Sequence, residues 1–210
     1  MTFTGGIGKG ANTIIRAIVR GLALSKIHPN VLTFLGLVIN GAAAVLLAAG
    51  MFRTAGYVII GAGLFDMVDG RVARETNQVT RFGGFFDSVL DRYSDLALLM
   101  GLLVYYGSIN RSFYVVLTAI VMTGAVMVSY TRARAENTIP KCKVGFMERP
   151  ERVVLLIIGA LFDRMAPVLW VIAVLSNITV IHRMAFTWQE TKRLEEAQLR
   201  GARAEKSISQ

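Results

Sequence analysis

Long apolar segments alternate with short polar ones along most of the chain, and several approach the length of a bilayer crossing. A transmembrane helix needs about 20 mainly apolar residues. The pattern predicts an all-α integral membrane protein with six transmembrane helices, at 31–50, 55–75, 83–106, 112–133, 150–163 and 166–184. The fifth span is short, so its charged start must reach membrane depth. A soluble all-α domain is the alternative, but it would leave several apolar segments uncovered.

The N-terminal segment 1–30 is too short and too charged to cross a bilayer. Its apolar residues share one helical face, with arginines elsewhere: Ile14, Ile15, Ile18, Val19 and Leu22 against Arg16 and Arg20. This pattern predicts an amphipathic helix at the membrane interface, with a frayed leader as the alternative. The expected organisation is this helix, a six-helix membrane domain at 31–186 and a cytoplasmic C-terminal tail at 187–210.

Composition supports the membrane assignment, because 54% of the 210 residues are hydrophobic and only 18% are charged. The net charge of +9 could suggest nucleic acid, but the distribution of basic residues indicates a membrane surface instead. Six spans place both termini on one side with most of the 23 Lys and Arg residues, leaving Arg53, Arg111 and Arg164 on the other. The positive-inside rule then predicts cytoplasmic termini in a cell inner membrane or plasma membrane.

Four aspartates interrupt the cytoplasmic ends of the second and third spans, where ionised side chains are costly and usually functional. On the second span, Asp66, Asp69, Gly70 and Ala73 follow an i, i+3, i+4, i+7 spacing, which places them on one helical stripe. On the third, Gly83, Asp87 and Asp91 follow i, i+4, i+8. If the two helices are antiparallel, the stripes can face each other and form a cup of four carboxylates.

Carboxylates without nearby His or Cys favour Mg²⁺, with Mn²⁺ as the alternative, over zinc. Two such ions would balance four negative charges and could orient a diphosphate for displacement at phosphorus. Salt bridging to nearby arginines is the simpler explanation, but it accounts for one or two aspartates rather than two aligned stripes.

The stretch from Asp66 to Asp91 matches the signature of the CDP-alcohol phosphotransferases at every fixed position. The matching residues are Asp66, Asp69, Gly70, Ala73, Arg74, Gly83, Asp87 and Asp91. "HPNVLTFLG" also resembles the segment with which the family begins its first span. The resemblance covers most of the chain and implies a membrane enzyme that transfers a phosphoalcohol from a CDP-alcohol to a hydroxyl group and releases CMP.

The resemblance also implies roles for individual residues. The metal ligands would be Asp66, Asp69, Asp87 and Asp91, with Asp91 also the base that takes the proton of the attacking hydroxyl. The CDP-lipid would be bound by Pro29, Asn30, Thr33, Asp69, Gly70, Ala73, Arg74, Thr80 and Gly83. The family further suggests a homodimer.

A second group of charges, "RARAE" and "ERPER", flanks the loop between the fourth and fifth spans. Its arginines are Arg132, Arg134, Arg149 and Arg152, at about the same level as the aspartates. Positive-inside charge that contacts anionic lipid is one interpretation. A pocket for an acceptor's phosphate group is the other, and we expect it because arginine forks suit phosphate.

The wider pattern "SYTRARAE…GFMERPERVV" closely resembles the phosphatidylinositol phosphate synthases of actinobacteria, a branch of this family with Lys expected at the position of Arg132. The resemblance implies CDP-diacylglycerol and inositol 3-phosphate as substrates. Glycerol 3-phosphate, free inositol and serine are alternative acceptors. An intramembrane prenyltransferase and a cation transporter are more distant alternatives.

Overall fold

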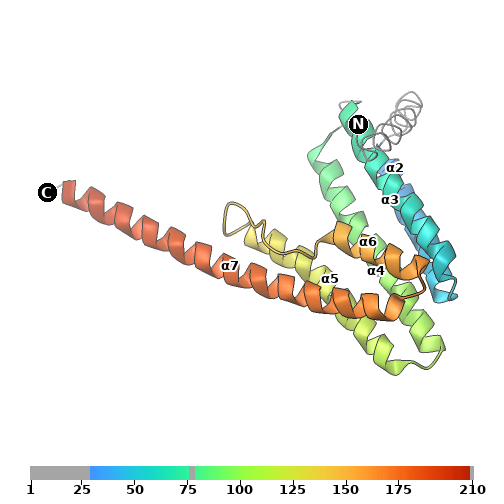
Figure 1. Ribbon diagram of the computed structural model, residues 1–210. Coiled ribbons are helices and arrows are strands. Elements are labelled where there is room, and N and C mark those ends of the chain that lie inside the picture. The colour runs from blue at the N-terminus through green and yellow to red at the C-terminus, as the bar shows by residue number, and fades with distance from the viewer. Residues whose placement is uncertain (1–28, 76–78, 209–210) are drawn as a thin grey trace, which may run out of the picture.

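The computed structural model describes residues 29–75 and 79–208, without the side chains of residues 29, 67–73, 75 and 201–208. These residues form helices and connections, with no strand among them. The helices are α2 (Pro29–Ala48), α3 (Phe52–Glu75), α4 (Arg81–Ser108), α5 (Ser112–Ala135), α6 (Arg149–Leu161) and α7 (Met165–Ile208) (Figure 1). The predicted all-α class and its six helices are confirmed. The amphipathic helix predicted before them falls outside the described residues.

Packing joins the six helices into a closed series of neighbours: α2 packs on α4, α4 on α5, α5 on α7, α7 on α6, α6 on α3, and α3 again on α2. Buried apolar side chains fill the centre, including Leu47, Ile59, Leu102, Val121 and Ile172. The two aspartate-bearing helices, α3 and α4, are therefore not close neighbours.

Small residues allow the tightest helix contacts. A Cβ added to Gly101 of α4 would lie 2.2 Å from the backbone oxygen of Ala44 in α2. A Cβ on Gly124 of α5 would lie 3.0 Å from the Ser176 side chain of α7. Close backbone approach of this kind is typical of helix packing in membranes, where small residues line the interface.

The outer surface is rich in large apolar side chains, such as Val45, Phe113, Val154 and Ile181, which a bilayer would cover. By length and composition alone, three helical stretches among the described residues could cross a membrane: Asn30–Ala48, Ser112–Ala135 and Met165–Arg200. The other helices depart from that pattern for visible reasons. Charged residues interrupt α3 and α4, and α6 has only 13 residues.

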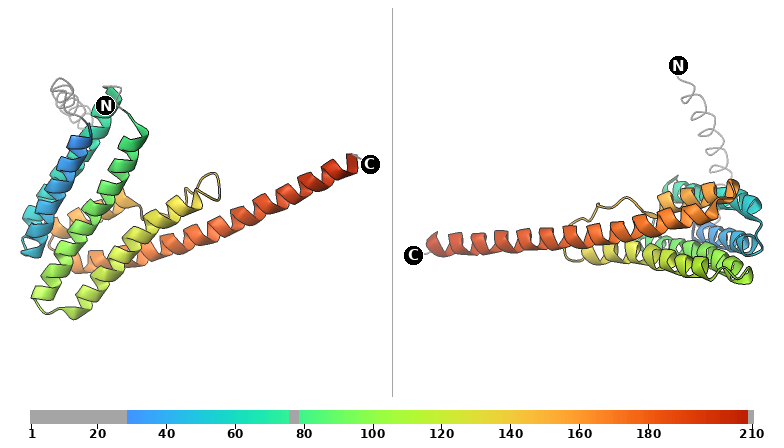
Figure 2. Two further views of the ribbon diagram at one scale, coloured as in Figure 1. Left: turned by 180° about the vertical axis from the view of Figure 1, so that it is seen from behind. Right: turned by 60° about the horizontal axis from the view of Figure 1, so that its bottom comes forward.

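Helix α7 extends well beyond the predicted sixth span. It continues without a break for 44 residues, about 66 Å at 1.5 Å per residue. Both views in Figure 2 show its C-terminal half projecting away from the other helices. The predicted tail is therefore helical through Ile208.

Candidate active site

Asp66, in the C-terminal half of α3, lies against the backbone of α2. A Cβ added to Gly36 would stand only 2.7 Å from Asp66 Oδ1, so the absence of a side chain at Gly36 makes room for this carboxylate. Gly36 was not predicted as a site residue, although it ends the "HPNVLTFLG" segment that resembles the family's first span.

Helix α4 begins at a defined cap, because the Thr80 hydroxyl accepts a hydrogen bond from the Gly83 backbone N–H at 2.9 Å. A Cβ on Gly83 would lie 3.0 Å from Thr80 Oγ1 and 3.4 Å from Asn30 Oδ1. Asn30, Thr80 and Gly83, which are all predicted to bind the CDP-lipid, therefore lie together. They come from α2, from the connection before α4 and from α4. Thr33, one turn along α2 from Asn30, is buried.

Asp87 and Asp91 follow on α4, one helical turn apart, and both side chains are half-buried. The two aspartate stripes approach each other at Asp66 and Asp91, which share one arginine partner. Direct packing of α3 on α4 does not bring these carboxylates together. A side chain from α6 joins them.

That side chain is Arg149, the first residue of α6. Its Nη2 lies 2.9 Å from Asp66 Oδ2, its Nη1 lies 3.0 Å from Asp91 Oδ1, and its Nε lies 3.4 Å from Asp95 Oδ1. One guanidinium therefore contacts carboxylates from α3 and α4, in the multidentate geometry for which arginine is suited.

Asp95 extends the α4 stripe by one more turn, four residues beyond Asp91, and it was not predicted as a site residue. It forms an ion pair with Arg152, which is one helical turn beyond Arg149. Both side chains are deeply buried, with Asp95 7% and Arg152 3% exposed. The i+4 spacing from Asp91 is the signal in the sequence that identifies it.

A second charge cluster fixes the start of α6. Glu148 caps the helix in a reciprocal arrangement with Glu151, each side chain accepting a backbone N–H from the other's position. Glu148 also pairs with Arg132 at 3.0 Å and with Arg183 of α7 at 2.6 Å. Arg183 is 1% exposed, although a basic residue at the end of a span carries no sequence signal of burial.

The four predicted arginines thus have different surroundings. Arg149 and Arg152 contact the α4 carboxylates, and Arg132 pairs with Glu136 and Glu148. Arg134 is exposed and has no ion pair with any side chain that the structure describes. Arg74 is also exposed. Asp69, Gly70 and Ala73 fall within α3, but their side chains, like that of Pro29, lie outside the described set.

The donors present fit a hard divalent cation, because Asp66, Asp87 and Asp91 supply only carboxylate oxygens. The described side chains include no group of three or more acidic, His or Cys residues close enough to form a complete metal cage. The fourth predicted ligand, Asp69, is not among them. The carboxylates described are therefore a partial set of the predicted ligands.

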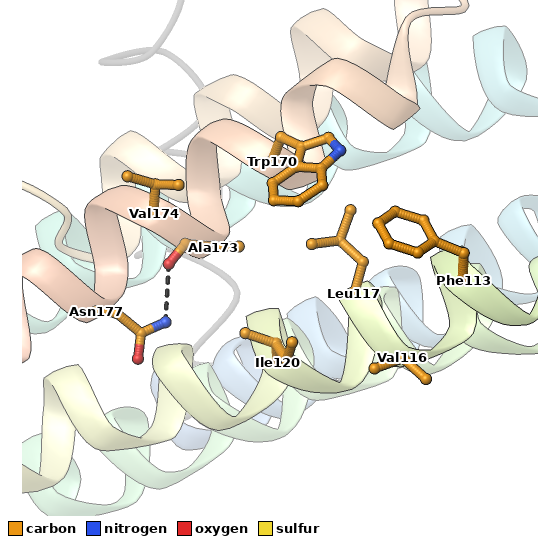
Figure 3. A pocket seen from close by; sticks show the side chains of 8 residues that line it. All are labelled: Phe113, Val116, Leu117, Ile120, Trp170, Ala173, Val174 and Asn177. Carbon is orange, nitrogen blue, oxygen red and sulfur yellow. Dashed lines mark hydrogen bonds between the residues drawn. The ribbon is translucent and has the colours of Figure 1, made fainter.

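A cavity of about 310 Å³ opens between α5 and α7, lined by Phe113, Val116, Leu117, Ile120, Trp170, Ala173, Val174 and Asn177 (Figure 3). The Asn177 side chain in this lining donates to the backbone oxygen of Ala173 on its own helix. The lining carries no ionisable group, so the cavity offers no charged ligand for a metal ion or a phosphate, and the carboxylate site is the candidate for chemistry.

A family model for the CDP-alcohol phosphatidyltransferases matches residues 26–189. The chain belongs to this family. It is an enzyme of the phosphatidyltransferase class, and the matched range contains every residue of the candidate site described above.

The chain is similar to an archaetidylinositol phosphate synthase from Pyrococcus horikoshii. The two are 36% identical over 187 residues, which cover 86% of this chain and 93% of the relative. A phosphatidylinositol phosphate synthase from Mycobacterium tuberculosis is 36% identical over 186 residues, covering 83% and 86%. The crystal structure of the M. tuberculosis synthase with CDP-DAG bound matches with a TM-score of 0.78 at 34% identity, over 84% of this chain and 94% of that one. The same synthase in complex with manganese and citrate matches with a TM-score of 0.77.

Proposed function

We propose that this phosphatidyltransferase moves the phosphatidyl group of CDP-diacylglycerol, or its ether-lipid equivalent, to a hydroxyl of inositol 3-phosphate. The products are CMP and a phosphatidylinositol phosphate that stays in the membrane. Support comes from the signature residues and from the relatives. One relative is named an archaetidylinositol phosphate synthase and another a phosphatidylinositol phosphate synthase.

The position of Arg149 is the observation that favours a phosphorylated acceptor. Its guanidinium contacts Asp91, the predicted base, and also Asp95, the partner of Arg152. A phosphate held by Arg149 and Arg152 would leave another part of the same small molecule beside Asp91. Free inositol has no anionic group to pair with these two cations, and serine offers a single carboxylate in place of a phosphate dianion.

In the proposed reaction, Asp91 accepts the proton of the acceptor hydroxyl, and the freed oxygen attacks the β-phosphorus of the CDP-lipid. A new P–O bond forms as the bond to CMP breaks, and CMP leaves with the electron pair. Two divalent cations, Mg²⁺ or Mn²⁺, held by Asp66, Asp69, Asp87 and Asp91, would neutralise the diphosphate. Asn30, Thr33, Thr80 and Gly83 would bind the nucleotide end, with Pro29, Gly70, Ala73 and Arg74 completing that side.

The proposal includes the setting of the site. Residues 31–186 form the membrane domain, residues 1–30 an interfacial helix and residues 187–210 a cytoplasmic tail, with the site on the cytoplasmic side of the inner or plasma membrane. The enzyme acts as a homodimer. Water-soluble inositol phosphate and CMP then reach and leave the site from the cytoplasm.

Release of labelled CMP by the purified protein tests the proposal. The assay compares inositol 3-phosphate, glycerol 3-phosphate, free inositol and serine, each with ester and ether CDP-lipids, in Mg²⁺, Mn²⁺ or chelator. We expect the fastest release with inositol 3-phosphate and none with chelator. Faster release with an unphosphorylated alcohol would contradict the assigned acceptor. Metal flux through liposomes without CMP release, or turnover of a prenyl diphosphate alone, would contradict the reaction.

A further inference from the structure

Asp95 is a buried carboxylate to which the reaction above gives no role. We propose that Asp95 is a positioning residue, which holds Arg149 and Arg152 together in the orientation that binds the acceptor's phosphate group. The inference rests on the proposed function for the identity of the acceptor. It adds a residue that determines specificity for a phosphorylated alcohol.

The contacts of Asp95 divide its two oxygens between the two arginines. Oδ1 lies 3.4 Å from Arg149 Nε, and Oδ2 pairs with Arg152 Nη2. The arginines are three residues apart on α6, so they lie on the same helical face and repel each other. A carboxylate between them offsets that repulsion and fixes both planar groups at once.

These contacts leave Asp95 no direct part in the chemistry. Its side chain is almost inaccessible, and both of its oxygens face guanidinium groups. Asp91, one turn nearer the start of α4, is more accessible and contacts Arg149 as well. Asp91 can therefore meet substrate, whereas Asp95 acts through the arginines.

One atom of this cluster has no partner. Arg152 Nη1 is buried and makes no hydrogen bond to any described residue, although buried polar groups are normally paired. Because Asp95 engages the other terminal nitrogen, Nη1 remains an unused donor. A phosphate oxygen would complete its hydrogen bonding, which gives the pair a reason to prefer an anionic acceptor.

A purely structural role for Asp95 makes different predictions. Burial of Arg152 without a counter-ion would destabilise the bundle as a whole and impair every substrate equally. A positioning role changes the KM for the acceptor alone. The KM for inositol 3-phosphate, compared with the KM for CDP-diacylglycerol, therefore separates the two roles.

The test compares wild type with Asp95→Asn and Asp95→Glu in the full-length protein. For Asp95→Asn, we expect the KM for inositol 3-phosphate to rise about tenfold or more, as for loss of a hydrogen bond to a charged group. The KM for CDP-diacylglycerol and the metal concentration for half-maximal activity should stay within about twofold. Asp95→Glu, which keeps the charge, should recover part of the acceptor affinity. Asp163→Asn, an exposed aspartate in the α6–α7 turn, is the matched control.

Equal rises in both KM values with a lower melting temperature would overturn the proposal, as would an unchanged acceptor KM. If Asp95→Asn does not fold, Arg152→Lys provides the second measurement, since it keeps the charge but loses the fork. Where both single variants fold, the double variant Asp95→Asn, Arg152→Lys should have a KM for the acceptor no higher than that of the more impaired single variant, because the two residues act as a unit.

Direct binding of inositol 3-phosphate and of inorganic phosphate, measured by calorimetry, separates this inference from the proposed reaction. Failure of wild type to release CMP would contradict the reaction alone. Wild-type phosphate binding that is weakened in Asp95→Asn would still support the positioning role. Binding that is absent in wild type, or unaffected by the variant, would overturn it.

Discussion

Arg183 of α7 and Glu148 at the start of α6 form an ion pair at 2.6 Å, and Arg183 is 1% exposed while Glu148 is 38% exposed. The arginine also donates to the backbone oxygens of Val128 and Val144. This side chain therefore ties together α5, the loop that follows it, α6 and α7.

Loss of the Glu148 carboxylate should destabilise the protein, because it leaves a buried guanidinium without its counter-ion. Breaking a buried pair costs about 3–5 kcal/mol, and the partial exposure of Glu148 puts Glu148→Gln at the lower end of that range. The melting temperature in detergent measures the effect. Glu136→Gln removes an exposed i, i+4 partner of Arg132 and should cost at most about 1 kcal/mol. Equal effects of the two variants would show that burial of Arg183 does not matter.

Gly36→Ala should impair metal binding more than folding. The new Cβ would stand 2.7 Å from Asp66 Oδ1, so this carboxylate would have to move from its position beside α2. We expect a higher metal requirement for CMP release and a melting temperature close to that of wild type. Gly41→Ala, on the same helix with nothing within 4 Å, is the control and should leave the metal requirement unchanged. The same metal dependence in both variants would contradict the role of Gly36.

Gly101→Ala should lower stability although alanine favours helix by about 0.5–1 kcal/mol over glycine. The added Cβ would meet the backbone oxygen of Ala44 at 2.2 Å, and backbone cannot rotate away as a side chain can. The two helices must separate, at a cost of about 1–3 kcal/mol. Gly107→Ala, on the same helix in open space, should be neutral or stabilising. The difference in melting temperature between the variants is the measurement, and no difference would mean that α2 and α4 adjust freely.

Asp91→Asn should reduce kcat by about 10²–10⁴, the range for loss of a general base. Because the amide retains the shape of the carboxylate and one oxygen that can bind metal, binding of the CDP-lipid should persist at saturating metal and can be measured directly with labelled CDP-lipid. Asp163→Asn is again the control. Near-normal turnover by Asp91→Asn with metal bound would show that another group takes the proton.

The helices can be predicted from the amino-acid sequence because apolar runs and charged ends mark them directly. The i, i+4 spacing of Asp87 and Asp91 likewise predicts one side of the carboxylate site. Asp95 continues the same stripe, but the family signature ends at Asp91 and therefore does not include it. Helix α7 is longer than its apolar run indicates, because helix-favouring polar residues continue it beyond the predicted span.

Other features depend on packing that no local pattern carries. The sequence predicts separate functions for the aspartates and the arginines, whereas Arg149 contacts Asp66 and Asp91 directly. That contact depends on α2 lying between α3 and α4, and on α6 reaching across them. The burial of Arg183 likewise depends on tertiary packing, because its partners come from α5, from the loop before α6 and from the start of α6.

Helix α7 is one continuous helix that joins the packed helices to a projecting part. Its first half is packed against α5 and α6, and its second half projects away from the other helices (Figure 2). Because the helix has no break between the two halves, a displacement of the projecting part would tilt the packed part. Arg183 lies on the packed half of α7 and pairs with Glu148, the residue directly before Arg149, so such a tilt would act on the first turn of α6, where Arg149 contacts the carboxylates.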